Sequence, residues 1–317
     1  MKRSIFLLMV GLAAFTVNAQ PQWPQKPVKV IVPFPPGGVT DGLARITADW
    51  LTQRLGQPVI AENRPGASGA IAAEAVARAE PDGYTLFSAA TPQLAIVPHV
   101  QKISYDPVKD FAPISIVGTN PFALACGDRI PSKTLNEFVA YVKARPGELS
   151  YASPGSGSVG HLSMALFLAR AGLKMEAVLY KGGGPAMADV VGGHVPCYFG
   201  NLNEIIPHAG GGKVKVYAVS GEKRAPQLPQ VPTVAEQGFP GFRTVTWNGY
   251  VAPANTPRPI IERVAREIAA GCKDPTFTGR LNKIGVDPVC STPDEFSQAI
   301  KEDLNTWKEA VQAAGMK

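Results

Sequence analysis

Four glycine-rich segments with neighbouring hydroxyl side chains are the features of this sequence best suited to bind a ligand. They lie at residues 35–42, 65–69, 153–160 and 181–185, and the hydroxyls are those of Thr40, Ser68, Ser156 and Ser158. Glycine leaves backbone N–H groups accessible, and a turn that opens a helix presents such groups to carboxylates or phosphates. One glycine-rich turn usually serves only to reverse the chain. Four of them, each with a hydroxyl or a second glycine beside it, indicate a site for an anion.

Catalytic and cofactor motifs fit these residues less well. Residues 155–160 (Gly-Ser-Gly-Ser-Val-Gly) match the dinucleotide fingerprint, but the next strand ends at Tyr180-Lys181, where that motif requires an acid. A P-loop requires Lys and Ser or Thr where this chain has His161 and Leu162, and neither serine has the flanking glycines of a serine hydrolase. We expect His161 to be a packed or capping residue. The sequence therefore favours binding without chemistry over an oxidoreductase or hydrolase.

The elements that must position these turns are clearest at the start of the chain. An apolar run at residues 30–32 is stopped by Pro35-Pro36-Gly37-Gly38, after which Leu43, Ile46 and Leu51 recur at helical spacing. Similar strand and helix units follow, which predicts a parallel sheet covered by helices on both faces, with the glycine turns at the carboxyl ends of the strands. A chain of 317 residues exceeds one typical core, so two lobes facing across a cleft are expected.

Composition and the first residues indicate an exported protein. The 31 basic and 25 acidic residues are scattered without a basic stripe, which excludes nucleic acid as the expected partner. Lys2 and Arg3 precede an apolar run that reaches Ala19 through small residues, the pattern of an export signal. That run is too short to cross a bilayer. We therefore expect cleavage after Ala19 and a mature protein in the periplasm.

The four cysteines lack the close spacing of metal sites, so no metal is expected. An oxidising compartment permits disulfides. Cys272 and Cys290 are the favoured pair because both lie in the C-terminal region. For Cys126 and Cys197, each inside an apolar strand-like run, buried free thiols are slightly favoured over a bond.

Seven motifs occur in order along nearly the whole chain after the export signal: WPQKP at 23–27, VPFPPGGVTD at 32–41, ENRPGA at 62–67, PDGYTL at 81–86, YDPVKDF at 105–111, YKGGGPA at 180–186 and VPT at 231–233. Together they resemble the Bug family, the extracytoplasmic solute-binding proteins of tripartite tricarboxylate transporters.

The resemblance implies a type II periplasmic-binding-protein fold, with two α/β lobes, a hinge and an interlobe cleft. Lobe 1 would comprise residues 20–121 and 222–317, and lobe 2 residues 122–221. The implied function is capture of an organic carboxylate, either a di- or tricarboxylate or an aromatic carboxylate, and its delivery to membrane permease subunits. The protein would be a monomer that needs no cofactor. A ligand sensor for a signalling partner and a secreted enzyme using the same cleft remain the alternatives.

The resemblance also implies which residues hold the ligand. The first two turns would bind a carboxylate through main-chain amides and bridging waters, and lobe 2 would supply the remaining contacts. The predicted ligand-binding residues are Phe34, Pro36, Gly37, Gly38, Thr40, Asp41, Gly66, Ala67, Ser68, Gly69, Ala90, Thr91, Ser153, Ser156, Gly157, Ser158, His161, Tyr180, Lys181, Gly182 and Asn201.

Two positions depart from the family pattern. Gly200 stands where family members commonly carry an acid, which favours a bulkier anion over an ammonium-bearing ligand. The segment at residues 89–92 (Ala-Ala-Thr-Pro) is poorer in glycine than the family turn, so the resemblance does not define which residues form the floor of the pocket.

Overall fold

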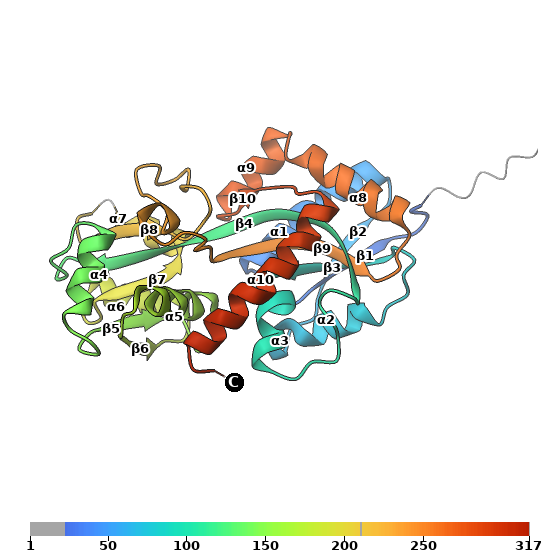
Figure 1. Ribbon diagram of the computed structural model, residues 1–317. Coiled ribbons are helices and arrows are strands. Elements are labelled where there is room, and N and C mark those ends of the chain that lie inside the picture. The colour runs from blue at the N-terminus through green and yellow to red at the C-terminus, as the bar shows by residue number, and fades with distance from the viewer. Residues whose placement is uncertain (1–22, 210, 317) are drawn as a thin grey trace, which may run out of the picture.

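The computed structural model describes residues 23–209 and 211–316, which form two α/β lobes side by side (Figure 1). The strand order is β2-β1-β3-β9-β4-β7-β5-β6, and β8 and β10 also pair with β4. Strand β4 (Phe111–Gly127) belongs to both lobes: residues 111–121 pair with β9 (Val245–Pro253), and residues 122–127 pair with β7 and β8. The predicted export signal lies outside the described residues.

The first lobe has helices on both faces of its sheet. Val30 and Ile31 are adjacent in β1 and belong to different apolar clusters, so both faces of the strand are buried. Helices α1, α8 and α9 cover one face, and α2 with part of α10 covers the other. Its elements are β1 (Val28–Val32), α1 (Val39–Leu55), β2 (Val59–Asn63), η1 (Ala67–Gly69), α2 (Ala70–Ala77), β3 (Thr85–Ala90), η2 (Pro92–Ile96), α3 (Val97–Val100), α8 (Arg258–Gly271), α9 (Pro275–Lys283), β10 (Asp287–Pro288) and α10 (Pro293–Ala313). The short helix η3 (Ala235–Gln237) instead contacts the second lobe, where Gln237 donates to the Tyr217 carbonyl.

The second lobe repeats this layering on a smaller sheet. Parallel strands β5 and β6 extend the sheet beyond β7, and β6 forms its edge. Helices α4 and α5 pack on one face, and α6 and α7 on the other. Its further elements are α4 (Leu135–Lys143), β5 (Ser150–Ser153), α5 (Val159–Ala171), β6 (Glu176–Leu179), α6 (Gly183–Val191), β7 (Cys197–Asn201), α7 (Leu202–Ala209) and β8 (Val214–Val219).

Strand β4 differs from the sequence-based expectation of two short strands at 114–117 and 122–126. The chain stays extended through Pro113 and Pro121, which lack the N–H that a central strand normally donates. The pairing with β9 shifts register between Pro113 and Ser115 and again between Ile116 and Gly118. The first shift lies beside Pro113, whereas Pro121 lies where the partners of β4 change from β9 to β7 and β8, so neither proline breaks the strand.

Helix α10 packs against both lobes and lies across the front of the molecule in Figure 1. Phe296 and Ile300 join the core of the first lobe, whereas Trp307 joins that of the second. An ion pair of 2.8 Å between Arg170 of α5 and Glu309 of α10 adds to the second contact. The sequence at residues 292–295 (Thr-Pro-Asp-Glu) predicts a capping box, and the helix begins with it: Thr292 and Glu295 satisfy each other's backbone amides. For α8 the sequence predicts Thr256 as the N-cap with Pro257 at the first helical position. That prediction is wrong, because Pro257 holds the N-cap position.

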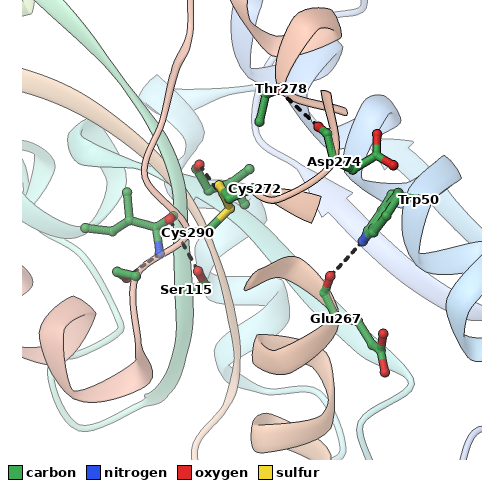
Figure 2. The surroundings of a disulfide bond; sticks show 10 residues. Trp50, Ser115, Glu267, Cys272, Asp274, Thr278 and Cys290 are labelled. Atoms are coloured by element: carbon green, nitrogen blue, oxygen red, sulfur yellow. Dashed lines mark hydrogen bonds between the residues drawn. A yellow bond between two sulfur atoms is a disulfide. The ribbon is translucent and has the colours of Figure 1, made fainter. Parts of the chain in front are cut away.

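All four cysteines are paired in disulfides. The bond between Cys272 and Cys290 confirms the favoured pair and ties the end of α8 to the segment before α10 (Figure 2). The preference for free thiols at Cys126 and Cys197 is wrong, because these residues lie directly opposite each other on β4 and β7 and are bonded. Nothing in the sequence indicated that the two residues are neighbours, because their sequence separation is 71.

None of the helices within residues 23–209 and 211–316 combines the length and apolar character needed to cross a membrane. Across the same residues no group of three or more His, Cys, Asp or Glu side chains is arranged to hold a metal ion.

Candidate functional site

The turn between β1 and α1 leaves the first amide groups of α1 uncapped. Gly37 has a positive φ of 94°, and Gly38 is the N-cap residue with φ −80°. No side chain caps the helix, and a Cβ placed at either glycine would have no atom within 4 Å. Phe34 is half-buried beside them, and Pro36 is exposed. The partial positive charge of the helix N-terminus is therefore accessible, as an anion-binding site requires.

Asp41 directs its carboxylate into this turn. It accepts hydrogen bonds from the Gly37 amide at 3.0 Å and from Asn63 Nδ2 at 2.8 Å, and it forms an ion pair with Arg45 at 3.0 Å. Burial acts to raise the pKa of Asp41, but these hydrogen bonds outweigh it and lower the pKa below its ordinary value. The residue is 3% exposed, so it supports the shape of the turn from behind the open amides.

Thr40 connects the turn to the shared strands. Its hydroxyl donates to Asn248 Oδ1 at 2.7 Å, and Asn248 Nδ2 donates to Asn120 Oδ1 at 2.9 Å. Asn120 in turn donates to the Gly285 carbonyl. Sequence reasoning missed both asparagines, because only the pairing of β4 with β9 brings them beside α1.

The loop at residues 284–285 lies between α1 and the second lobe. A Cβ at Gly42 of α1 would lie 3.3 Å from Ile284 Cδ1, and a Cβ at Gly285 would overlap the side chain of Asn203 in α7. The open end of α1 and the start of α7 therefore both reach this loop.

The second predicted turn has an unusual backbone that a buried glutamine holds in place. Residues 66–69 all have positive φ, at 131°, 47°, 55° and 89°. Gln93 donates to the Ser68 carbonyl at 2.9 Å and accepts from the Ala90 amide at 3.0 Å, so it joins this turn to the end of β3. A Cβ at Gly69 would overlap Gln93 and Pro33, which explains the glycine. Gln93 was missed because an isolated glutamine carries no sequence signal.

Ala90 and Thr91 lie behind the surface of the site. Their exposed fractions are 1% and 0%. Besides the bond from the Ala90 amide to Gln93, the Thr91 hydroxyl accepts from the Trp247 amide at 2.9 Å. They position β3 against β9 and leave contact with a ligand to their neighbours.

The turn between β5 and α5 commits most of its polar groups to its own structure. Ser158 caps α5 by accepting from the His161 amide at 3.2 Å and donates to the Gly155 carbonyl at 2.7 Å. His161 Nδ1 accepts from the Gly157 amide at 3.1 Å. Burial lowers the pKa of His161, which keeps the ring neutral and able to accept this bond. The capping role expected for His161 is confirmed.

Two serines of the same turn differ in exposure. Ser153 is buried and donates to the Gly155 carbonyl at 3.2 Å. Ser156 is exposed at the tip of the turn. Ser156 is therefore the hydroxyl in this turn that is best placed to meet a ligand.

The turn between β6 and α6 places Gly182 at the N-cap of α6, with φ 111° and no side-chain cap. Tyr180 turns away from that end and donates to Asp189 at 2.6 Å. Lys181 is exposed.

Glu204 is a residue of this region that sequence reasoning missed. It projects from α7 and accepts a hydrogen bond of 2.6 Å from the Tyr198 hydroxyl. A Cβ at Gly200 would overlap the Tyr198 ring, and a Cβ at Gly183 would overlap the Glu204 carboxylate. The expectation that Gly200 leaves free volume and removes a negative charge is therefore wrong, because Tyr198 fills that volume and Glu204 supplies an acid nearby.

A cavity of about 240 Å³ lies against Tyr198 and Glu204 in the second lobe. It contains Ser158 and Asn201 of the predicted residues, whereas the predicted residues of the first lobe lie outside its lining. A larger cavity of about 490 Å³ lies beside β10. The lining of the smaller cavity is Phe122, Pro154, Ser158, Val159, Gly160, Tyr198, Asn201 and Glu204.

Known proteins that are similar to this chain in sequence and in structure show which family it belongs to. The model of the tripartite tricarboxylate transporter family receptor (TctC) matches residues 43–316. The chain belongs to this family. Among curated TctC-family relatives, the protein BugT of Bordetella pertussis is 36% identical over 315 residues, which span 99% of this chain and 96% of BugT.

Solved structures of similar proteins confirm the type II periplasmic-binding-protein fold. A protein of R. palustris solved with adipate is 34% identical, with a TM-score of 0.74 over 93% of this chain and 99% of its own. MatC from Rhodopseudomonas palustris with bound malate is 33% identical, with a TM-score of 0.71 over 91% and 100% of the two chains. A TctC solute-binding protein from Polaromonas gives a TM-score of 0.85 at 28% identity, over 92% and 99% of the two chains.

Proposed function

We propose that this TctC-family protein captures an organic carboxylate in the periplasm and delivers it to the membrane permease of a tripartite tricarboxylate transporter. The observation that carries the proposal is the open N-terminus of α1, where Gly37 and Gly38 leave main-chain donors accessible and no side chain caps the helix. A carboxylate placed there would interact favourably with the helix dipole and the free amides.

The similar structures support the choice of ligand class. Two of them hold adipate and malate, which are both carboxylates. In this chain the polar groups around the turns mostly bond one another, as Ser158, His161 and Asp41 illustrate. A site of this kind suits binding and release of an unchanged ligand, so we assign no catalytic residue.

Closure of the two lobes over the ligand is part of the proposal. The lobes would be residues 20–121 with 222–317, and residues 122–221, because the partners of β4 change between residues 121 and 122. The contacts predicted for the first lobe would hold one end of the ligand, and Ser156 and Asn201 would approach it from the second. The protein would act as a monomer after removal of residues 1–19.

Native mass spectrometry of the purified mature protein tests this proposal directly. A retained small acid that is recovered unchanged after denaturation would support capture, and its mass would identify it. Isothermal titration with adipate and malate would then measure binding to the emptied protein. A retained cation, or conversion of the bound acid to a product, would contradict the proposal.

A further inference from the structure

On the second-lobe side of the candidate site, Glu204 occupies the position where a second carboxylate of a ligand would be expected to bind. Helix α6 has the features of an anion-binding end, with Gly182 as an uncapped N-cap and two further glycines after it. Glu204 of α7 brings its own carboxylate against Gly183, the first residue of α6. A carboxylate at a helix N-terminus is stabilised by the helix dipole. The protein thus supplies the anion for this helix itself.

Tyr198 holds the carboxylate there. Its ring is fully buried, and its hydroxyl donates to Glu204 Oε2 at 2.6 Å. Burial and the neighbouring carboxylate raise the pKa of Tyr198, so the phenol keeps its proton and remains the donor. The missing side chain at Gly200 is what allows the Tyr198 ring to take this position.

Within residues 23–209 and 211–316, no cation offsets the charge of Glu204 in an ion pair. Among the described residues, its carboxylate takes part in none of the contacts within 4.0 Å between Lys, Arg or His nitrogens and acids. Glu204 also lines the cavity of about 240 Å³ together with Phe122 and Val159. The wall that faces a ligand from the second lobe therefore combines apolar surface with one negative charge.

We propose that Glu204 is a specificity-determining residue, which selects carboxylates whose distal group is a hydrogen-bond donor, a hydroxyl or an ammonium, over those that end in a second carboxylate. The inference rests on the proposed capture of a carboxylate by the open end of α1. The ligand's carboxylate would bind in the first lobe, and its other end would face Glu204. A second carboxylate there would be repelled, because like charges brought together in a partly desolvated site weaken binding.

Three acids of equal chain length test this inference: adipate, ω-hydroxyhexanoate and ω-aminohexanoate. Isothermal titration of the mature wild-type protein should give at least roughly tenfold tighter binding for one of the two donor-bearing acids than for adipate. Glu204→Gln should reduce the ratio of the two affinities, mainly by strengthening the binding of adipate. The amide keeps the size of the side chain and removes its charge.

Two further variants separate charge from packing. Tyr198→Phe removes the donor and leaves the Glu204 charge, so the preference should persist. Glu148→Gln, at an exposed acid elsewhere in the same lobe, should leave all three affinities unchanged.

Three outcomes would overturn the inference. Equal or tighter binding of adipate by the wild type would do so without any variant, and so would an unchanged ratio in a folded Glu204→Gln protein. Binding of none of the three acids, nor of malate, would overturn the proposed capture of carboxylates itself. The first two results would leave the proposed capture of carboxylates intact. Failure of the Glu204 inference can therefore be distinguished from failure of the proposed function.

Discussion

The Asp41 carboxylate accepts a hydrogen bond from the Gly37 amide at 3.0 Å, so that a side chain in the first turn of α1 closes the loop that leads into the same helix. The bond consumes one backbone donor of the glycine turn and fixes the direction of those that follow. The negative charge that would otherwise repel an anion is directed inward, toward Arg45 and Asn63.

Asp41→Asn should destabilise the protein by about 1–3 kcal/mol at pH 7, because a buried charged acceptor loses its ion pair with Arg45. The pKa of Asp41 is lower in the folded state than its ordinary value. Its stabilising effect is therefore complete above the unfolded pKa near 4 and is lost as the pH falls through the folded pKa. Urea denaturation at pH 7 and pH 3 should show the difference between wild type and variant shrinking in acid. Asp49→Asn, at an exposed ion pair with Arg280, should cost less than about 1 kcal/mol.

Gly38→Asp should reduce affinity for a carboxylate by roughly a hundredfold or more while leaving the fold intact, because the new charge would stand at the open amides of α1. The substitution is sterically permitted, since Gly38 has φ −80° and a Cβ there meets no atom within 4 Å. Isothermal titration calorimetry with an acid that the wild type binds measures the loss of affinity. Gly279→Asp, at an equally open glycine of α9, is the matched control. Unaltered affinity in Gly38→Asp would place the site elsewhere.

His161 should make stability depend on pH below neutrality. Burial lowers its pKa in the folded protein, so the native state binds fewer protons than the unfolded chain around and below pH 6.5. Stability should fall as the pH drops from the unfolded pKa through the folded one, because a protonated ring cannot accept from the Gly157 amide.

Denaturation at pH 7.5 and pH 5.5 measures this effect. Burial also lowers the pKa of His99, so the comparison with His161→Gln isolates the contribution of one residue. The glutamine keeps an acceptor and has no charge to gain, so the variant should lose less stability in acid. A histidine NMR titration that gave His161 a pKa above 6.5 would contradict the prediction.

Replacing Cys272 and Cys290 with serine should lower the free energy of unfolding by about 3 kcal/mol, because the bond closes a short loop with a sequence separation of 18. Removing the bond between Cys126 and Cys197 should cost more, about 4 kcal/mol, since the separation is 71. Urea denaturation of the two double variants provides the comparison. The Cys272 and Cys290 variant should retain its affinity for ligand, because the bond joins the end of α8 to the segment before α10, and none of the residues labelled around it in Figure 2 is a predicted ligand-binding residue.

Local signals in the sequence predicted the elements and several of their boundaries. The capping box at Thr292 and the glycine turn before α1 both depend on neighbours a few residues apart, and both occur as expected. The capping role of His161 was predictable for the same reason.

Contacts between distant segments were not predictable. Glu204 meets Gly183 only because α6 and α7 pack on the same face of the second sheet, and Asn120 meets Asn248 only through pairing of β4 with β9. Glycine at position 200 suggested an empty and uncharged space. Residues 198 and 200 of β7 lie on the same face of the strand, and the Tyr198 ring fills the space instead.

The continuity of β4 governs how the two halves of the molecule can move. No flexible loop interrupts this strand between Phe111 and Gly127, and β9, β7 and β8 hold it by backbone bonds along most of that length. Any rotation of one half against the other must twist the strand elastically near Pro121 and Phe122, as in a torsion spring. The energy stored in that twist would favour reopening of the two halves, and so would hasten release of a bound ligand.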